Sequence, residues 1–321
     1  MTVNNQCGRN SSPKIVVTSV SFGKSAILRE ELLKIFPNSA FNESGQRLSG
    51  KELIEFISDA DAAIVGVETI NDSILEHTPK LKIISKYGVG LDSINQEALK
   101  RRNIFLGWKG GVNQRSVAEL TLCFMLGLCR NVFDSGFKLK KSEWDKNGGR
   151  QLSGKAVGII GCGHIGSDVV RLLSPLNCKV LVQDIIDKSD FCRKQGASEA
   201  SLGEIIERSD IISLHVPLTK LTLQMVNKGF LQKMKSTAFL INTCRGEVVD
   251  QEALKNALDQ RIIAGAALDV FIEEPPSDSE LLSLPNLMVT PHIGGNAEEA
   301  VETMGRSAIN HLVSFFSPQK S

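Results

Sequence analysis

VGIIGCGHIG, residues 157–166, joins an apolar, strand-like run directly to three spaced glycines, Gly161, Gly163 and Gly166. This spacing allows a tight turn, a close approach of the backbone to a pyrophosphate, and close packing of the next helix. Residues 167–173 are compatible with that helix, and a second strand-like run ends in Asp184. The order of strand, turn, helix, strand and acid predicts a dinucleotide site, with the pyrophosphate at the helix N-terminus and the ribose on Asp184.

Flexible turns also match this glycine pattern, so the prediction depends on the strands, the helix and the acid around it.

The chain has 321 residues, which suggests two domains that each bury a core. Apolar residues make up 42% and charged residues 23%, as in an ordinary soluble enzyme. The net charge of +1 gives no indication of a nucleic-acid partner, although a local basic patch would not change this total much.

Compartment and metal content are inferred from the N-terminus and the cysteines. Residues 1–14 are polar and lack the apolar core of a signal peptide, and no apolar run has the length of a bilayer span. The seven cysteines are odd in number and form no Cys-x-x-Cys pair, and the five histidines are scattered. We therefore expect a cytoplasmic protein with reduced thiols, no membrane partner and no structural metal.

Strand-like and helix-like segments alternate along the chain, which predicts α/β architecture with two Rossmann-like domains and parallel sheets. Residues 1–109 and 296–321 are expected to form the substrate domain, which has no phosphate-binding glycine pattern. Residues 110–295 are expected to form the dinucleotide-binding domain. The expected strands are residues 14–20, 62–67, 81–85 and 103–107 in the first, and 156–160, 179–183, 210–216, 237–242, 262–268 and 287–290 in the second.

Paired glycines stand where the chain is expected to cross between the domains, at residues 110–111 and 294–295. They suit a hinge that closes a cleft, but they are also compatible with ordinary loops. A final helix over residues 297–315 has its apolar residues spaced for one face, and we expect it to return to the first domain.

An apolar helix is predicted to begin at Val117 and end at Cys129. Ser116 and Glu119 have the spacing of a capping box that would open it. Because the helix is apolar nearly all round, most of its surface must be covered. The cover is either the rest of the chain or a second subunit, and we expect a homodimer through this region.

Three chemically reactive side chains follow strands of the second domain. Arg245 stands in the turn after residues 237–242, Glu274 follows residues 262–268, and His292 follows residues 287–290. An open α/β sheet binds its ligand at the carboxyl ends of its strands, so the three can converge although they are far apart in sequence. Each alone could be a structural or surface residue.

Together these residues suit hydride transfer to or from a hydroxy acid. Histidine, with a reference pKa of about 6.5, can exchange the hydroxyl proton. A carboxylate can orient the imidazole and favour its charged form. A guanidinium can clamp a carboxylate or carbonyl oxygen with forked hydrogen bonds.

The segments GCGHIG, HVPLT, NTCRGEVVDQEAL, LDVFIEEP, TPHIGG and SKYGVGLDSIN resemble the D-isomer-specific 2-hydroxyacid dehydrogenases. The resemblance covers about residues 14–315 and looks closest to short phosphoglycerate dehydrogenase-like members without a regulatory domain. Because the chain stops at Ser321, feedback control through such a domain is not expected.

This resemblance implies that Arg245 binds the substrate, that His292 is the acid/base, and that Glu274 orients and charges His292. It also implies that Tyr87, Gly88, Val89 and Gly90 form a substrate-binding loop, whose backbone N–H groups bind the substrate carboxylate. Lys86, beside this loop, is either a phosphate ligand or a solvated charge. The implied cofactor-binding residues, with those of the glycine turn, are Gly161, Gly163, His164, Ile165, Gly166, Asp184, His215, Val216, Pro217, Thr222, Thr243, Cys244, Asp269, Gly294 and Gly295.

The sequence predicts one cofactor but only a class of substrates. NAD is expected over NADP, because Asp184 repels a 2′-phosphate and no arginine follows it. The substrate is a D-2-hydroxy acid or its 2-oxo acid; D-3-phosphoglycerate, glycerate, glyoxylate and a polysaccharide-precursor acid stay open. The alternative class is a non-catalytic, NAD(H)-sensing corepressor of the same fold. A phosphite enzyme is a further alternative, whereas a formate enzyme would carry an amide in place of Glu274.

One segment departs from the family pattern. Relatives usually have an Asn-Thr-Pro-like turn where this chain has GWKGGVN, residues 107–113. Trp108 and Lys109 are therefore candidates to reshape the hinge or the mouth of the pocket.

Overall fold

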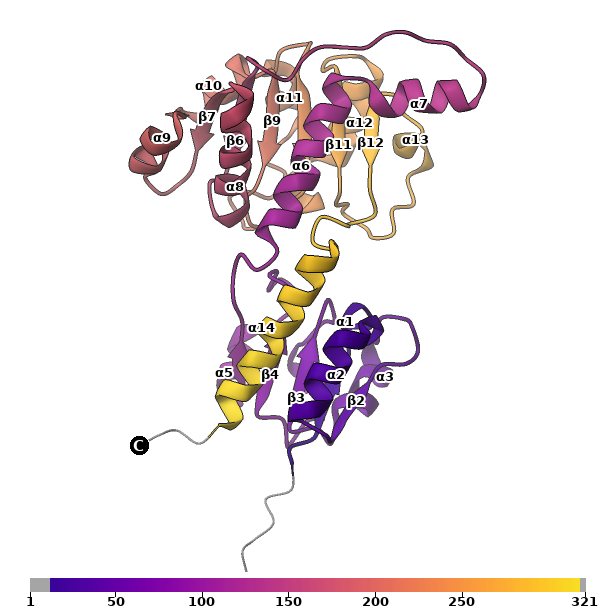
Figure 1. Ribbon diagram of the computed structural model, residues 1–321, viewed down its shortest axis with the longest axis vertical. Helices are drawn as coiled ribbons and strands as arrows, with labels where there is room; N and C mark the ends of the chain where they lie inside the picture. Colours follow the sequence, from indigo (N-terminus) through magenta and orange to yellow (C-terminus); the bar gives the residue numbers. More distant parts are fainter. Residues whose placement is uncertain (1–11, 318–321) are drawn as a thin grey trace, which may run out of the picture. The chain divides into compact units, whose positions relative to one another are not determined.

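The protein is described by a computed structural model in which residues 12–317 are placed. These residues form two compact units (Figure 1). Unit 1 contains the residues up to Asn113 and those from Glu298 onward, and unit 2 is Gln114–Ala297. Each unit has one parallel sheet flanked by helices, which confirms the predicted α/β class.

Unit 1 has a five-stranded sheet in the order β2-β1-β3-β4-β5. Its strands are β1 (Ile15–Val17), β2 (Ser39–Phe41), β3 (Ala62–Val65), β4 (Ile83–Lys86) and β5 (Phe105–Gly107). Its helices are α1 (Val20–Lys24), α2 (Ala26–Ile35), α3 (Gly50–Ile57), α4 (Asp72–Leu75), α5 (Gln96–Arg101) and α14 (Glu298–Phe316). The strand order reverses between β1 and β3, so the loops after these strands diverge and leave room for a ligand at the carboxyl edge.

The last helix, α14, belongs to unit 1 and packs against β4 and α2 (Figure 1). Its buried side chains include Met304, Ile309 and Leu312 on one face, as the apolar spacing predicts. Gly305 fits against Leu28 so closely that a Cβ there would lie 2.3 Å from a leucine methyl carbon. The helix therefore closes the core of unit 1 from the far end of the chain.

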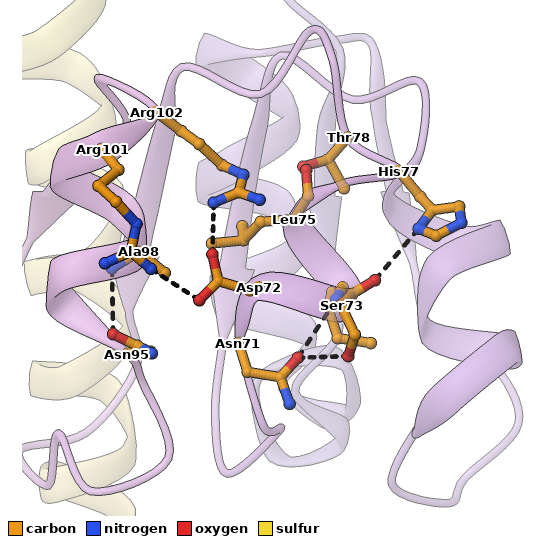
Figure 2. Close-up of polar contacts among 11 residues, drawn as sticks. Asn71, Asp72, Ser73, Leu75, His77, Thr78, Asn95, Ala98, Arg101 and Arg102 are labelled. Atoms are coloured by element: carbon orange, nitrogen blue, oxygen red, sulfur yellow. Dashed lines mark hydrogen bonds and ion pairs between the residues drawn. The ribbon is translucent and has the colours of Figure 1, made fainter.

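The short helices α4 and α5 are joined by ion pairs, and each is capped at its own N-terminus (Figure 2). Asp72 accepts hydrogen bonds from Arg101 Nη2 at 2.7 Å and Arg102 Nη1 at 2.6 Å. Asn71 caps α4 through the N–H of Ile74, and Asn95 caps α5 through the N–H of Ala98. These contacts fix the start of α5. They therefore also fix the C-terminal end of residues 87–95, the segment that connects β4 to α5.

Unit 2 has a seven-stranded sheet in the order β12-β11-β10-β9-β6-β7-β8, again with a reversal, between β6 and β9. Its strands are β6 (Ala156–Ile160), β7 (Lys179–Gln183), β8 (Ser198–Glu199), β9 (Ile211–Leu214), β10 (Phe239–Asn242), β11 (Gly265–Leu268) and β12 (Leu287–Val289). The helices are α6 (Gln114–Cys129), α7 (Val132–Lys140), α8 (His164–Leu173), α9 (Ser189–Gln195), α10 (Leu202–Arg208), α11 (Lys228–Lys233), α12 (Gln251–Asp259) and α13 (Ser279–Leu282), with 3-10 turns at Ser174–Leu176 and Gly246–Val248.

Helix α6 begins at Gln114, so the predicted capping box at Ser116 and Glu119 is wrong. Ser116 lies inside the first turn, and its hydroxyl instead donates to the carbonyl of Gly294 at 2.5 Å and accepts from the N–H of Ala297 at 3.4 Å. The hydroxyl thus joins the two ends of unit 2. The rest of α6 buries one face against α8.

In the part of the chain that the structure places, no single helix is long and apolar enough to cross a bilayer. Helices α6 and α7 reach the required length and composition only as a pair, across a 65° bend.

Candidate active site

The glycine turn of unit 2 joins β6 to α8. Gly161 has φ +89, and a Cβ at Gly166 would lie 2.1 Å from the carbonyl oxygen of Gly161, so neither position accepts a side chain. Gly163 is exposed, and no atom lies within 4 Å of the place where its Cβ would stand. His164 and Ile165 form the first turn of α8. The turn therefore fits a pyrophosphate, which would approach over Gly163 at the N-terminus of the helix.

Asp184 lies directly after β7, beside the glycine turn. Its Oδ2 accepts the N–H of Cys162 at 2.6 Å, and its Oδ1 accepts the N–H of Ile186 at 3.0 Å. Burial raises the pKa of the Cys162 thiol to about 11, so this neighbour is neutral. A carboxylate has further lone pairs, which leaves Asp184 able to accept ribose hydroxyls in the orientation that these two bonds fix.

The loop after β9 stands against the same turn, because a Cβ on Gly161 would lie 2.6 Å from the carbonyl oxygen of His215. His215 Nε2 is 2.9 Å from Ser213 Oγ, and burial lowers the pKa of the imidazole to about 3. Further along, Thr222 donates to the carbonyl of Pro217 at 2.6 Å. The predicted cofactor residues from His215 to Thr222 thus form one braced loop at the carboxyl edge of the sheet.

The turn after β10 presents Arg245, and its shape depends on Asn242, which the sequence analysis missed. Asn242 Oδ1 accepts the N–H of Cys244 at 3.0 Å, and its amide nitrogen donates to the carbonyl of Arg245 at 2.8 Å. Burial raises the pKa of the Cys244 thiol to about 11. Thr243 Oγ1 lies 3.0 Å from Thr121 Oγ1 of α6. The signal available in the sequence is a polar Asn that ends the apolar run of β10.

Glu274 and His292 meet in unit 2, with Glu274 Oε2 2.8 Å from His292 Nδ1. Glu274 Oε1 accepts the N–H of Phe271 at 3.1 Å, which orients the carboxylate. The hydrogen bond and negative charge of Glu274 raise the pKa of His292 against the opposing effect of burial. Burial acts to raise the pKa of Glu274, but its interactions with His292 outweigh this and lower it.

Arg245 belongs to the same electrostatic cluster. Its positive charge contributes to the lowering of the Glu274 pKa and partly offsets the raising of the His292 pKa. A link between their backbones supports this placement, because a Cβ at Gly246 would lie 2.0 Å from the carbonyl carbon of Phe271. The structure thus brings together the guanidinium, the carboxylate and the imidazole that the sequence selected.

Asp269, the residue directly after β11, stabilises the loop that carries His292. This carboxylate is 1% exposed and accepts three hydrogen bonds, from Thr290 Oγ1 at 2.5 Å, Ile293 N at 2.8 Å and Gly294 N at 2.8 Å. His292 itself has φ +54, an uncommon backbone conformation for a residue with a side chain. The bonds to Asp269 stabilise this conformation. They also show that Asp269 and Gly294 serve the fold of the loop, while contact with the cofactor stays a prediction for both and for Gly295.

The predicted substrate-binding loop lies in unit 1, after β4. Tyr87 is buried, its hydroxyl lies 3.1 Å from Ser21 Oγ, and burial raises its pKa. Lys86 is 5% exposed, and its ammonium donates to the carbonyl of Gly66. The N–H of Gly66 in turn donates to the buried carboxylate of Glu68 at 2.7 Å. The charge of Lys86 is therefore engaged inside unit 1.

The middle of this loop is more open. Gly88 has φ +111, and residues 88–90 are partly exposed. Within residues 12–317, no protein group accepts a hydrogen bond from the backbone N–H of Val89 or Gly90. No group of three or more metal-ligating side chains occurs among the placed residues.

Comparison with known proteins gives consistent results. The family model for the NAD-binding domain of the D-isomer-specific 2-hydroxyacid dehydrogenases matches residues 122–294. A glyoxylate reductase from Pyrococcus furiosus is 36% identical over 283 residues, which are 85% of this chain and 84% of that protein. A D-3-phosphoglycerate dehydrogenase from Methanocaldococcus jannaschii is 36% identical over 282 residues, which are 87% of this chain and 54% of that protein.

The solved structures agree with the fold. The D-lactate dehydrogenase of Aquifex aeolicus, in complex with NAD and lactic acid, superposes with a TM-score of 0.82 at 27% identity, covering 94% of both chains.

Proposed function

The chain belongs to the D-isomer-specific 2-hydroxyacid dehydrogenases, NAD-dependent enzymes, and we propose that it reduces a small, unphosphorylated 2-oxo acid of the glyoxylate class to its hydroxy acid. The observation that carries this proposal is the 2.8 Å pair of Glu274 and His292 within the field of Arg245. The corepressor alternative is distinguished by turnover, because an NAD(H)-sensing protein would bind NADH tightly without reducing any 2-oxo acid.

NADH held by the glycine turn of unit 2 and by Asp184 would supply the hydride for the carbonyl carbon of the substrate. His292 Nδ1 is held by Glu274, so Nε2 is the nitrogen left to face the substrate. As hydride arrives and the C=O π bond breaks, the imidazolium gives its Nε2 proton to the oxygen, which becomes the hydroxyl. Glu274 stabilises the charged form before transfer, and the neutral imidazole is the base for the reverse direction.

We assign substrate positioning to Arg245 and to the Tyr87–Gly90 segment. The planar guanidinium of Arg245 can hold the substrate carboxylate or carbonyl oxygen with two parallel hydrogen bonds. The N–H groups of Val89 and Gly90, which have no acceptor among residues 12–317, suit a carboxylate. The family resemblance supports both roles.

The choice of an unphosphorylated acid follows from Lys86. Lys86 is the cation that could neutralise a substrate phosphate beside this loop, but its ammonium is buried on the carbonyl of Gly66, next to the carboxylate of Glu68. The glyoxylate reductase name of the Pyrococcus relative supports the same choice. The phosphoglycerate alternative has the Methanocaldococcus relative in its favour.

The experiment is a substrate panel with purified protein, monitored by NADH absorbance: glyoxylate, hydroxypyruvate, pyruvate, 2-oxoisocaproate and 3-phosphohydroxypyruvate. We expect the highest kcat/KM with glyoxylate or hydroxypyruvate. A preference for 3-phosphohydroxypyruvate would favour the phosphoglycerate alternative. His292→Ala should lose several orders of magnitude in kcat with little change in NADH affinity; turnover equal to the wild type would remove His292 from this role.

We further propose that the protein is a homodimer through the region of α6 and α7. None of the side chains of α7 is buried, and Phe137 is 61% exposed. Val132 and Leu126 add to this apolar surface, which an isolated subunit would leave in water. The charge of Lys138 on this surface is paired within its own subunit, with Asp134 and Asp145.

Light scattering coupled to size-exclusion chromatography tests this assembly. Phe137→Glu should yield monomers, whereas Ile27→Glu, at an exposed position on α2, should leave the mass unchanged. A monomeric wild type would contradict the proposal.

We also propose a cytoplasmic location, supported by the six placed cysteines, all of which are free thiols; Cys7 lies outside the described residues.

A further inference from the structure

We propose that Trp108 is a positioning residue that fixes the carboxylate-binding loop after β4, an inference that rests on the proposed function of that loop. The indole Nε1 of Trp108 donates a hydrogen bond to the carbonyl oxygen of Val89 at 2.9 Å. Both residues belong to unit 1. Trp108 lies in the segment GWKGGVN, residues 107–113, where this chain departs from the usual Asn-Thr-Pro-like turn of the family.

The sheet places Trp108 beside the loop. Strands β4 and β5 are paired in parallel, and the last register pair is Ser85 with Gly107. Trp108 directly follows the last residue of β5, and Tyr87 directly follows the last residue of β4 and begins the loop. The tryptophan therefore stands next to the loop because of strand register, although 19 positions separate it from Val89.

The hydrogen bond acts on the N–H that the substrate needs. The Val89 carbonyl and the Gly90 N–H belong to the same trans peptide, so they point in opposite directions. Holding the oxygen on the indole side directs the N–H to the other side. A hydrogen bond to the carbonyl also polarises the peptide and strengthens its N–H as a donor.

The loop needs this support in its middle. Its beginning is held by the N–H of Tyr87, which donates to Val65 O at 2.8 Å, and its end by the N–H of Ile94, which donates to Leu91 O at 3.0 Å. Between these points Gly88 has φ +111, a conformation open to glycine, and Gly90 follows Val89. The peptide between Val89 and Gly90 has a glycine on one side and lies one residue after another glycine, so its backbone can flip more easily than one between two residues with side chains; the indole N–H opposes that flip.

The first test is Trp108→Phe, which keeps an aromatic ring and removes the N–H. We expect KM for the 2-oxo acid to rise about 3- to 10-fold, the value of one net hydrogen bond, with kcat within about twofold of the wild type. The Kd for NADH should not change. The matched control is Trp144→Phe, which alters the chain's other tryptophan, 79% exposed in unit 2, and should leave KM unchanged.

A second measurement keeps Trp108 in place. In the Trp144→Phe protein, Trp108 is the sole tryptophan, and oxalate is a carboxylate probe without turnover. Titrating oxalate into this protein with NADH present should shift the Trp108 emission. An unchanged emission at oxalate concentrations that inhibit the enzyme would overturn the inference.

The outcomes separate the two proposals. Unchanged KM in Trp108→Phe, in an enzyme that reduces 2-oxo acids and loses activity in Arg245→Lys, would overturn the role of Trp108 alone. No reduction of any 2-oxo acid by the wild type would overturn the proposed function instead. A raised KM with unchanged kcat and NADH affinity would support both.

Discussion

His292 Nδ1 and Glu274 Oε2 lie 2.8 Å apart, although 18 positions separate the two residues along the chain. The contact raises the pKa of the histidine and lowers that of the acid, so the proton that the pair holds resides on the imidazole. That is the state needed to protonate the oxygen of a 2-oxo acid. Because this contact sets the pKa of His292, the pH dependence of the reduction rate measures the interaction between the two residues.

Glu274→Gln should move the pH profile of reduction. Reduction needs protonated His292, so its rate is high below the raised pKa of His292 and falls as pH increases through it. The neutral amide removes the charge that raises this pKa, so the falling limb should move to lower pH. We also expect kcat to fall about 10- to 100-fold, the value of a charge-assisted hydrogen bond. The measurement is the pH dependence of kcat/KM for reduction.

Glu273→Gln is the matched control for this profile. Glu273 is the adjacent acid, but its carboxylate accepts from Ser277 Oγ at 3.0 Å and not from the histidine. Its variant should keep the wild-type profile. A Glu274→Gln profile that coincides with the wild type would show that the observed limb belongs to another group.

Arg245→Lys should reduce kcat/KM about 10- to 100-fold while leaving NADH affinity nearly intact. Lysine keeps the positive charge but lacks the planar fork, so one of two parallel hydrogen bonds to the substrate is lost. Steady-state kinetics against the 2-oxo acid provide the measurement. Arg208→Lys, on the exposed face of α10, is the control. Wild-type kinetics in Arg245→Lys would place the substrate elsewhere.

Asp184→Asn should weaken NADH binding about tenfold, since a neutral amide accepts ribose hydroxyls less strongly than a carboxylate does. It should also narrow the gap between NADH and NADPH, because the repulsion of a 2′-phosphate is removed. Fluorescence titration with both cofactors measures this. Asp187→Asn, three residues further on and exposed, should bind both as the wild type does. A wild type that prefers NADPH would contradict our choice of NAD.

Several elements of this fold could be predicted from local pattern. Ten of the twelve strands among the placed residues lie in apolar runs of the sequence, and the glycine turn is identified by its spacing together with the strands and the acid around it. The edge strands β2 and β8 are not predicted, because Ser39–Phe41 and Ser198–Glu199 form no apolar run. A strand without an apolar run is stabilised by pairing with its neighbour, so local sequence patterns do not reveal it.

The candidate site shows the same division. Arg245, Glu274 and His292 could be selected because each follows a strand and has side-chain chemistry suited to the reaction. Ser116 was assigned to its own helix because a capping box is defined by sequence spacing, whereas its partners lie 178 and 181 positions away. The bond between Trp108 and Val89 likewise depends on strand register, which no local pattern contains.

Asp269→Ala should destabilise unit 2 and disturb His292 together. The substitution leaves three donors in or near the interior without their acceptor, the Thr290 hydroxyl and the N–H groups of Ile293 and Gly294. We expect a loss of about 3 kcal/mol and a Tm lower by roughly 5–10 °C. Below that Tm, kcat should still fall, because the loop no longer stabilises the φ of +54 at His292.

The control for this prediction is Asp259→Ala, at the exposed end of α12, which should change neither Tm nor kcat. Thr290→Val removes one of the three donors and should give a smaller loss of stability than Asp269→Ala. If Asp269→Ala kept the wild-type Tm, the buried carboxylate would not be what stabilises the loop. A lowered Tm with unchanged kcat would mean that the position of His292 is set by Glu274 alone, because the 2.8 Å bond would then suffice to hold the imidazole.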